Sequence, residues 1–302
     1  MTWGAGIDVG GSHVKAVAVA ADGRVLHRAT RATRDGTATP ADWVALARDL
    51  VAEFGRAIGA EAAAVGVGAP GLAAADERSI AFLPGKLQGL AGLDWTTALG
   101  RTTPVPVLND AHAALLGEAW TGAAAGKRDV VLLTLGTGVG GAVMSDGRLL
   151  RGARGRAGHL GHVSLDPDGP KSITGMPGAL EVQFGDCTVA ERSGGRFSTT
   201  AALVSAHRAG DAAATAVWLR SVRALACALG GAINAFDPES IVLGGGIAHA
   251  GEALFGPLAV EMERYEWRPG GARVPIVAAT LGEWAGAIGA ARNGFLHAEL
   301  SS

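Results

Sequence analysis

The sequence predicts an α/β protein with two lobes of similar construction, and three observations support this prediction. Short apolar runs typical of strands alternate along the chain with longer segments of helical periodicity. A strand, a glycine turn and a second strand open the chain, and the same pattern returns after residue 129. Glycines gather at or just after apolar runs, at residues 10–11, 66–71, 136–141 and 244–246. Glycine at the end of a strand permits a tight turn or the close approach of a ligand to the backbone.

Length and composition allow two domains with sizeable cores. The chain has 302 residues, of which 48% are hydrophobic and 18% charged, a balance opposite to that of disordered chains. The net charge is −2 and Lys and Arg are scattered, which argues against a nucleic-acid partner. Only two cysteines occur, Cys187 and Cys227, so neither a disulfide framework nor a cysteine-rich metal site is expected. We find no signal peptide and no apolar run that could cross a membrane, and therefore expect a cytoplasmic protein without a membrane partner.

The first half of the chain is expected to open with an antiparallel meander closed by the turn residues Asp22-Gly23. Its predicted elements are a strand ending at residue 9, strands over 14–20, 24–28, 65–67 and 105–108, and helices over 41–58 and 111–121.

The second half repeats the strand, glycine turn and strand, and then becomes irregular over residues 151–196. Its predicted elements are strands over 129–135, 139–145, 240–243 and 276–278, helices between 199 and 236, and a closing helix over 283–296. We expect a small lobe over residues 1–110, with the C-terminal segment 283–302 packing back on it, and a large lobe over residues 111–282.

Three glycine-rich segments after predicted strands are candidates for a nucleotide site. They run Asp8-Val9-Gly10-Gly11-Ser12-His13-Val14-Lys15, Gly136-Thr137-Gly138 and Gly244-Gly245-Gly246. Backbone N–H groups of such turns can line a phosphate, and Asp8 can hold Mg²⁺ through water. Taken singly, the first segment is equally consistent with an ordinary hairpin, and the third with close packing of a helix on a strand. The second segment is not a Walker A loop, because no Gly-Lys-Ser/Thr ends it.

Asn109-Asp110 lies where a predicted strand gives way to a helix. A carboxylate in such a place can act as a general base. The alternative is that Asp110 only caps the helix, since Asp is a favoured N-cap residue.

Together, and in this order, these segments resemble the phosphate and adenosine elements of the superfamily that contains actin, hexokinase and the heat-shock chaperone ATPases. The finer resemblance, over nearly the whole chain, is to the ROK family (repressors, open reading frames and sugar kinases). Val67-Gly68-Ala69-Pro70-Gly71 resembles the Gly-x-Pro-Gly turn of that family, and Asn109-Asp110 its sugar-binding Asn and catalytic Asp. Gly161-His162 and Gly178-Ala179-Leu180-Glu181 resemble its sugar-loop segment.

This resemblance implies a two-lobed actin-like ATPase fold of the ribonuclease-H-like type, a homodimer, and phosphorylation of a sugar hydroxyl, commonly the 6-hydroxyl of a hexose. ATP and Mg²⁺ are the implied cofactors. Asp110 is the expected general base, and Gly71, Asn109, His162 and Glu181 are expected to contact the sugar. The expected nucleotide residues are Asp8, Gly10, Gly11, Ser12, Lys15, Gly136, Thr137, Gly138, Gly244, Gly245 and Gly246.

The chain departs from the zinc motif of the family, which is a His followed by Cys-x-Cys-Gly-x-x-Gly-Cys-x-Glu. His162 and Glu181 are in place, but the three cysteine positions hold Ser172, Thr174 and Ala179. One imidazole cannot make a tetrahedral site alone, and these three residues supply no thiolate, so we expect no zinc. The segment 164–178 is expected to be ordered by its prolines and by packing.

Two further departures concern the sugar pocket. His159 stands where the family usually has Glu, and Lys86 aligns with a usual Asn. Because a neutral His both accepts and donates and Lys only donates, these changes favour a sugar that presents acceptors, such as a carboxylate, carbonyl or phosphate. The alternative is that both are solvated surface residues.

Three other functions are alternatives to an ATP-dependent sugar kinase. A DNA-binding repressor would carry a helix-turn-helix ahead of Asp8, and only seven residues precede it, too few for one. A sugar sensor without catalysis is separated from a kinase by measured phosphotransfer. Some relatives without the zinc cysteines use polyphosphate, and competition between ATP and polyphosphate separates that donor from ATP. The sequence leaves the identity of the sugar open.

Overall fold

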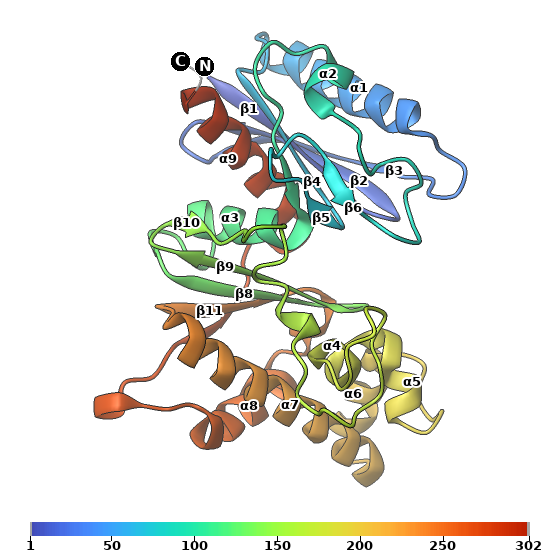
Figure 1. Ribbon diagram of the computed structural model, residues 1–302, viewed down its shortest axis with the longest axis vertical. Coiled ribbons are helices and arrows are strands. Elements are labelled where there is room, and N and C mark those ends of the chain that lie inside the picture. The colour runs from blue at the N-terminus through green and yellow to red at the C-terminus, as the bar shows by residue number, and fades with distance from the viewer. Residues whose placement is uncertain (1, 301–302) are drawn as a thin grey trace. The chain divides into compact units, whose positions relative to one another are not determined.

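The computed structural model describes residues 2–300, and the chain divides into two compact units (Figure 1). Unit 1 runs to Gly126 and also includes Leu149–Ala157 and the chain from Thr280, whereas unit 2 comprises Lys127–Arg148 and Gly158–Ala279. The lobe boundary that we expected after residue 110 therefore differs. Helix α3 (Asp110–Thr121) belongs to unit 1, because it packs along α9 (Ala285–Leu300).

Unit 1 is built on a five-stranded sheet with the order β3-β2-β1-β4-β7. The first three strands form the predicted antiparallel meander, and β4 runs parallel to β1 and β7. The strands are β1 (Trp3–Val9), β2 (His13–Ala20), β3 (Val25–Ala32), β4 (Ala64–Ala69) and β7 (Val107–Asn109), with a small hairpin of β5 (Leu72–Ala73) and β6 (Ile80–Phe82).

The two faces of β1 contact different helices. Ile7 and the other odd-numbered residues of β1 are buried in a core with Trp43 of α1 (Pro40–Ile58) and Trp95 of α2 (Trp95–Leu99). The opposite face lies against α9, where glycine is required. A Cβ on Gly6 would come within 1.8 Å of the Ala287 carbonyl oxygen. Gly66 of β4 allows the same approach to α9, so part of the glycine cluster at 66–71 serves helix packing.

Unit 2 repeats the pattern of unit 1. Its sheet has the order β10-β9-β8-β11-β12, with β8 antiparallel to β9 and β11 parallel to both β8 and β12. The strands are β8 (Val130–Leu135), β9 (Val139–Ser145), β10 (Arg148–Leu149), β11 (Ser240–Gly244) and β12 (Ile276–Ala278). The α/β class and the repeat of two similar halves are confirmed.

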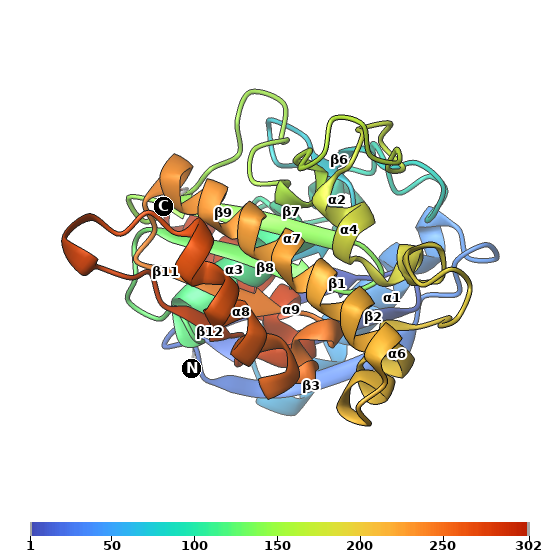
Figure 2. The same cartoon turned by 90° about the horizontal axis from the view of Figure 1, so that it is seen from below.

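The helices of unit 2 pack against its sheet (Figure 2). Apolar side chains of these helices and of the strands form one core. The helices are α6 (Thr200–Arg208), α7 (Ala212–Phe236) and α8 (Glu252–Tyr265), with the short α4 (Leu180–Phe184) and α5 (Val189–Arg192) and the 3-10 turns η1 (Leu160–His162), η2 (Asp186–Thr188), η3 (Gly246–Ala250) and η4 (Pro269–Gly271); η5 (Gly282–Trp284) precedes α9 in unit 1.

Among the described residues, α7 is the helix long and apolar enough to cross a membrane by length and composition alone, which our reading of the sequence did not recognise. Its apolar residues are explained by the core of unit 2. Trp218, Leu225 and Leu229 are fully buried there, and the Trp218 indole N–H donates to the Ala253 carbonyl oxygen at 2.8 Å. The apolar composition of α7 is thus that of a core helix.

Candidate active site

Two carboxylates of unit 1 meet where parallel strands end. Asp8 pairs in register with Gly68 of β4, and Gly68 pairs with Leu108 of β7, so the ends of all three strands lie at one edge of the sheet. Burial, and then the negative charge of Asp110, raise the pKa of Asp8 to about 7, while Lys15 opposes the shift. Asp110 follows β7 directly, so the strand register places it near Asp8, in agreement with its effect on the pKa of Asp8.

Asn109 organises the start of α3. Its buried side chain accepts from the Ala111 N–H at 2.9 Å and donates to the Gly71 carbonyl oxygen at 2.8 Å. Asn109 is therefore the N-cap of α3, and Asp110 is the first helical residue. The Asp110 carboxylate is exposed and stands in the first turn, where the helix dipole favours negative charge.

The first predicted phosphate turn, Gly10-Gly11-Ser12, joins β1 to β2. The Gly10 N–H donates to the His13 carbonyl oxygen at 3.0 Å. Thr33, which our sequence analysis did not single out, stabilises this turn. Its hydroxyl donates to the Gly10 carbonyl oxygen at 2.6 Å, and its N–H donates to the Ser12 carbonyl oxygen at 3.0 Å. Lys15 stands opposite Asp8 on β2 and forms an ion pair of 3.1 Å with Glu283.

The Gly-x-Pro-Gly turn requires glycine at its last position. Gly71 has a φ of 101°, and a Cβ there would lie 2.5 Å from the Phe82 carbonyl oxygen. Lys86 lies in the exposed loop between β6 and α2, as expected of an ordinary surface lysine. The structure thus joins Gly71 to Asn109 and leaves Lys86 in solvent.

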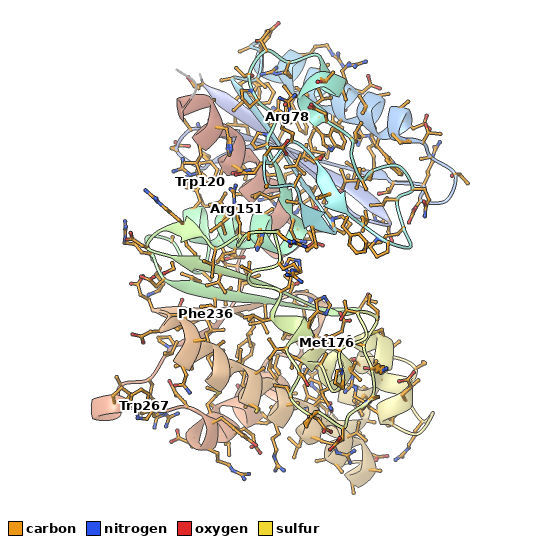
Figure 3. The ribbon with its side chains drawn as sticks, in the orientation of Figure 1. Arg78, Trp120, Arg151, Met176, Phe236 and Trp267 are labelled. Atoms are coloured by element: carbon orange, nitrogen blue, oxygen red, sulfur yellow. The ribbon has the colours of Figure 1, made fainter. Side chains whose placement is uncertain are left out.

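The segment before His159 is fixed on unit 1 by two side chains that our sequence analysis did not use. Arg151, labelled in Figure 3, forms an ion pair with Glu77. The ring Nε2 of buried His112 lies 3.1 Å from the Ala157 carbonyl oxygen, so the ring nitrogen is the donor. His112 follows Asp110 by two residues on α3, and a His next to the Asn-Asp pair was the signal that could have found it.

In unit 2 the predicted phosphate loop Gly136-Thr137-Gly138 turns from β8 into β9. The Gly136 N–H donates to the Gly138 carbonyl oxygen at 3.0 Å, and Thr137 is exposed. The segment after α4 supports this loop from outside. The Asp186 N–H donates to the Gly136 carbonyl oxygen at 3.0 Å, and the Cys187 N–H donates to the Thr137 carbonyl oxygen at 2.8 Å.

A pocket of about 580 Å³ opens beside this loop, within the size range of small-ligand sites. It brings the second and third predicted glycine segments together with residues that the sequence did not indicate. Its lining comprises Gly136, Thr137, Asp186, Thr200, Ala201, Val204, Arg208, Gly246, Ile247, His249 and Ala250.

Of the third glycine segment, Gly246 lines this pocket and the other two glycines serve the fold. Gly244 ends β11. Gly245 has a φ of 84°, and a Cβ there would lie 2.4 Å from the Leu135 carbonyl oxygen. The alternative of close backbone packing thus holds for Gly245.

The predicted sugar-loop residues of unit 2 lie around the start of β9. The rings of His159 and His162 are stacked, with centroids 6.3 Å apart. Gly161, between them, allows η1 to touch β9, since a Cβ there would lie 1.8 Å from the Val139 carbonyl oxygen. Glu181 is buried in the first turn of α4 and accepts a hydrogen bond of 3.2 Å from the Val139 N–H.

The loop at the zinc-motif positions is closed by hydrogen bonds. The hydroxyls of Ser172 and Thr174 lie 2.9 Å apart and bond to each other. The Ser164 hydroxyl donates to the Pro177 carbonyl oxygen at 2.6 Å. Within residues 2–300, no group of three or more His, Cys, Asp or Glu side chains is arranged to hold a metal ion.

Comparison with known proteins places these features in a family. The profile of the ROK family matches residues 4–293. Glucokinase of Thermotoga maritima is 35% identical over 305 residues, which cover 95% of each chain. N-acetylmannosamine kinase of Escherichia coli is 32% identical over 293 residues, covering 94% of this chain and 96% of the relative.

Solved structures of ROK family kinases resemble this chain over nearly its whole length. A ROK hexokinase from Thermus thermophilus superposes with a TM-score of 0.88 at 32% identity over 99% of each chain. A ROK family glucokinase from Streptomyces griseus, in complex with glucose and AMPPNP, has a TM-score of 0.78 at 28% identity, covering 97% of this chain and 99% of that one. The chain belongs to the ROK family and has the two-lobed actin-like ATPase fold of its kinases.

Proposed function

We propose that this ROK family carbohydrate kinase transfers the γ-phosphoryl group of ATP to a hydroxyl of a hexose or hexose derivative, the 6-hydroxyl being the expected acceptor, and that Asp110 takes the proton. The observation that carries this proposal is the division of work between Asn109 and Asp110. Asn109 is the N-cap of α3, whereas the exposed Asp110 carboxylate, which also accepts from the Ala111 N–H at 2.8 Å, lies at the end of the sheet where Asp8 lies. A carboxylate exposed at such a position can take the proton of a substrate hydroxyl.

A sugar hydroxyl attacks phosphorus slowly at neutral pH unless a base accepts its proton. As the bond from the sugar oxygen to phosphorus forms and the bond from phosphorus to the ADP oxygen breaks, the proton passes to Asp110. Asn109, Gly71, His162 and Glu181 are the residues proposed to orient the sugar. Positioning of both reactants supplies much of the rate enhancement in phosphoryl transfer.

The proposed donor is ATP, bound in the pocket of unit 2. Thr137, beside Gly136 in the pocket lining, offers an exposed hydroxyl of the kind that suits phosphates. Much of the remaining wall is apolar, from Ala201, Val204, Ile247 and Ala250, which suits a flat adenine ring. Polyphosphate would favour a basic wall, and Arg208 is the one Lys or Arg among these pocket residues. The apolar wall therefore favours the nucleotide.

The carboxylates of unit 1 fit Mg²⁺. Asp8 is held at an unfavourable site by burial and by Asp110, and a bound cation would offset both effects. Mg²⁺ commonly uses one or two carboxylates and takes its other ligands from water and phosphates, as this residue set requires. Asp8 would hold the ion through water, and the ion would neutralise charge on the phosphates.

The proposed sugar is a hexose that carries an acceptor group, such as an N-acetyl carbonyl or a carboxylate. His159 supports this, because an imidazole N–H can donate where a glutamate could only accept. Lys86 adds no support, since it is exposed. The family resemblance also leads us to propose a homodimer in the cytoplasm.

A panel of aldoses, ketoses, amino sugars, N-acetyl sugars and sugar acids, offered with ATP and Mg²⁺, tests the proposal. We expect sugar-dependent ADP formation with at least one hexose, and a turnover about 10²–10⁴-fold lower for Asp110→Asn. A protein that binds a sugar but phosphorylates none would be a sensor. One that prefers polyphosphate to ATP in competition would contradict the proposed donor.

A further inference from the structure

The two carboxylate oxygens of Glu181 have different surroundings. Oε2 accepts a hydrogen bond of 3.2 Å from the N–H of Val139, the residue directly after the phosphate loop Gly136-Thr137-Gly138. Oε1 is buried and has no hydrogen-bond donor within the part of the chain that the structure describes. A buried carboxylate oxygen without a donor is unfavourable, so a ligand hydroxyl that donates to Oε1 gains from the contact.

The phosphate loop is shaped to receive this carboxylate. A Cβ built on Gly138 would lie 2.1 Å from Glu181 Oε2, and the atoms nearest to that Cβ are all from the Glu181 side chain. Gly138 has no left-handed φ, so its backbone conformation does not itself demand glycine. Glycine at 138 is therefore explained by the close approach of Glu181.

The backbone around Glu181 joins the phosphate loop to the predicted sugar loop. On one side, the Leu180 N–H donates to the Val163 carbonyl oxygen at 2.9 Å, directly after His162. On the other side, the Glu181 carbonyl oxygen accepts from the Gly185 N–H at 2.7 Å, and Asp186 then bonds the loop at Gly136. The Nδ1 atom of His162 is also buried without a hydrogen-bond partner among the described residues. Two unsatisfied polar atoms thus belong to one hydrogen-bonded group of segments in unit 2.

We propose that Glu181 couples the two substrates: it holds the phosphate loop through Oε2 and receives a hydroxyl of the acceptor sugar at Oε1. A bound sugar fixes the carboxylate, and the fixed carboxylate fixes Val139 and the phosphate loop before it. The sugar therefore tightens the binding of the nucleotide. This inference rests on the proposed function, because it takes the acceptor to be a sugar that donates from a hydroxyl.

Glu181→Gln separates the two contacts. The amide oxygen still accepts from the Val139 N–H, but the amide nitrogen that replaces the other oxygen donates and cannot receive a hydroxyl proton. The probe is the dissociation constant of AMPPNP with Mg²⁺, measured without sugar and with saturating glucose or N-acetylmannosamine. In the wild type we expect the effective sugar to tighten AMPPNP binding by about fivefold or more. In Glu181→Gln we expect unchanged binding of AMPPNP alone, loss of the tightening, and a KM for sugar raised about tenfold.

Gly138→Ala perturbs the same contact from the loop side, because the added methyl group displaces the carboxylate. We expect that sugar no longer tightens AMPPNP binding in Gly138→Ala, and we expect the same of Glu181→Ala. The closest contacts of the added Cβ are all with Glu181. The double variant should therefore bind AMPPNP, with and without sugar, about as Glu181→Ala alone does. Gln183→Ala, a half-buried residue of α4, is the matched control and should keep the tightening. Circular dichroism and the Tm of each variant exclude unfolding as the cause.

The outcomes are distinguishable. A wild type that phosphorylates no hexose would overturn the proposed function and this inference with it. If the wild type is active and Glu181→Gln keeps the full tightening of AMPPNP by sugar, the coupling role of Glu181 is wrong while the proposed function stands. A Gly138→Ala variant in which sugar still tightens AMPPNP binding fully would likewise contradict the contact on which the coupling rests.

Discussion

Replacing Asp8 by Asn is expected to stabilise the metal-free protein at neutral and alkaline pH while removing its activity. Burial and the charge of Asp110 raise the pKa of Asp8 from its ordinary value of 3.8 to about 7. Between these values the folded protein binds more protons than the unfolded chain. Stability therefore falls as pH rises through this window, and the full cost remains above pH 7. Asparagine has nearly the same shape and carries no charge, so it removes this cost.

The magnitude follows from the shift in pKa. A shift of about 3 units, at about 1.4 kcal/mol per unit, corresponds to at most about 4 kcal/mol of destabilisation by the ionised carboxylate. We expect the difference in the free energy of unfolding between Asp8→Asn and the wild type to be small near pH 4. It should grow to about 2–4 kcal/mol near pH 8.

Urea unfolding with EDTA present, followed by circular dichroism and tryptophan fluorescence at about pH 4, 6 and 8, measures this difference. Asp49→Asn, at an exposed aspartate of α1, is the control and should show no such growth with pH. If Asp8→Asn is no more stable than the wild type at about pH 8, the ionised Asp8 carboxylate does not destabilise the fold. Retention of sugar-kinase activity by Asp8→Asn would separately contradict its proposed role towards Mg²⁺.

Three further predictions concern other buried groups and the metal content. Buried Glu118 accepts from the N–H groups of Ala123, Thr280 and Leu281, so Glu118→Ala should lower the free energy of unfolding by about 3 kcal/mol in denaturant titration. A loss below about 1 kcal/mol would show that water replaces the carboxylate. The Thr200 hydroxyl is buried without a partner among the described residues and lines the pocket, so Thr200→Val should raise the KM for ATP and leave the KM for sugar unchanged in steady-state kinetics. Equal changes in both KM values would count against it. The purified protein should contain no zinc by elemental analysis, and about one zinc per chain would contradict this expectation.

Local patterns predicted most of the fold because its elements are short, strongly apolar and separated by glycine. The meander of β1 to β3 and the repeat at β8 and β9 follow from strand patterns and turn residues close together in the chain. The lobe boundary did not follow in this way. Helix α3 joins unit 1 because it packs on α9, more than 160 residues later, and no local pattern reports that contact.

In the candidate site, too, local patterns predicted some features and left others undecided. Asn109 and Asp110 are both favoured N-cap residues, so the sequence could not tell which of them caps α3. The hydrogen bonds of Asn109 to Ala111 and Gly71 show that Asn109 is the N-cap and Asp110 the first helical residue. Glycine patterns were ambiguous for a related reason. Gly246 lines the pocket, whereas Gly66 and Gly245 allow backbone packing, and both uses follow a strand.

Thr200 and His249 were missed because nothing in their neighbourhood marks them. Thr200 opens an ordinary amphipathic helix, and His249 lies in a short turn after the third glycine segment. They meet at one pocket only through the fold of unit 2. Polar residues that gather from distant segments are the part of a binding site that single-sequence patterns do not reveal.

Comparison of the wild type with Asp110→Asn shows whether Asp110 is the base of a sugar kinase. Sugar-dependent ADP formation is measured for wild type and Asp110→Asn, alongside AMPPNP affinity and Tm for both proteins. We expect turnover to fall about 10²–10⁴-fold in Asp110→Asn, with AMPPNP affinity and Tm nearly unchanged. Wild-type turnover in Asp110→Asn would show that Asp110 is a residue of the first helical turn without a part in the chemistry.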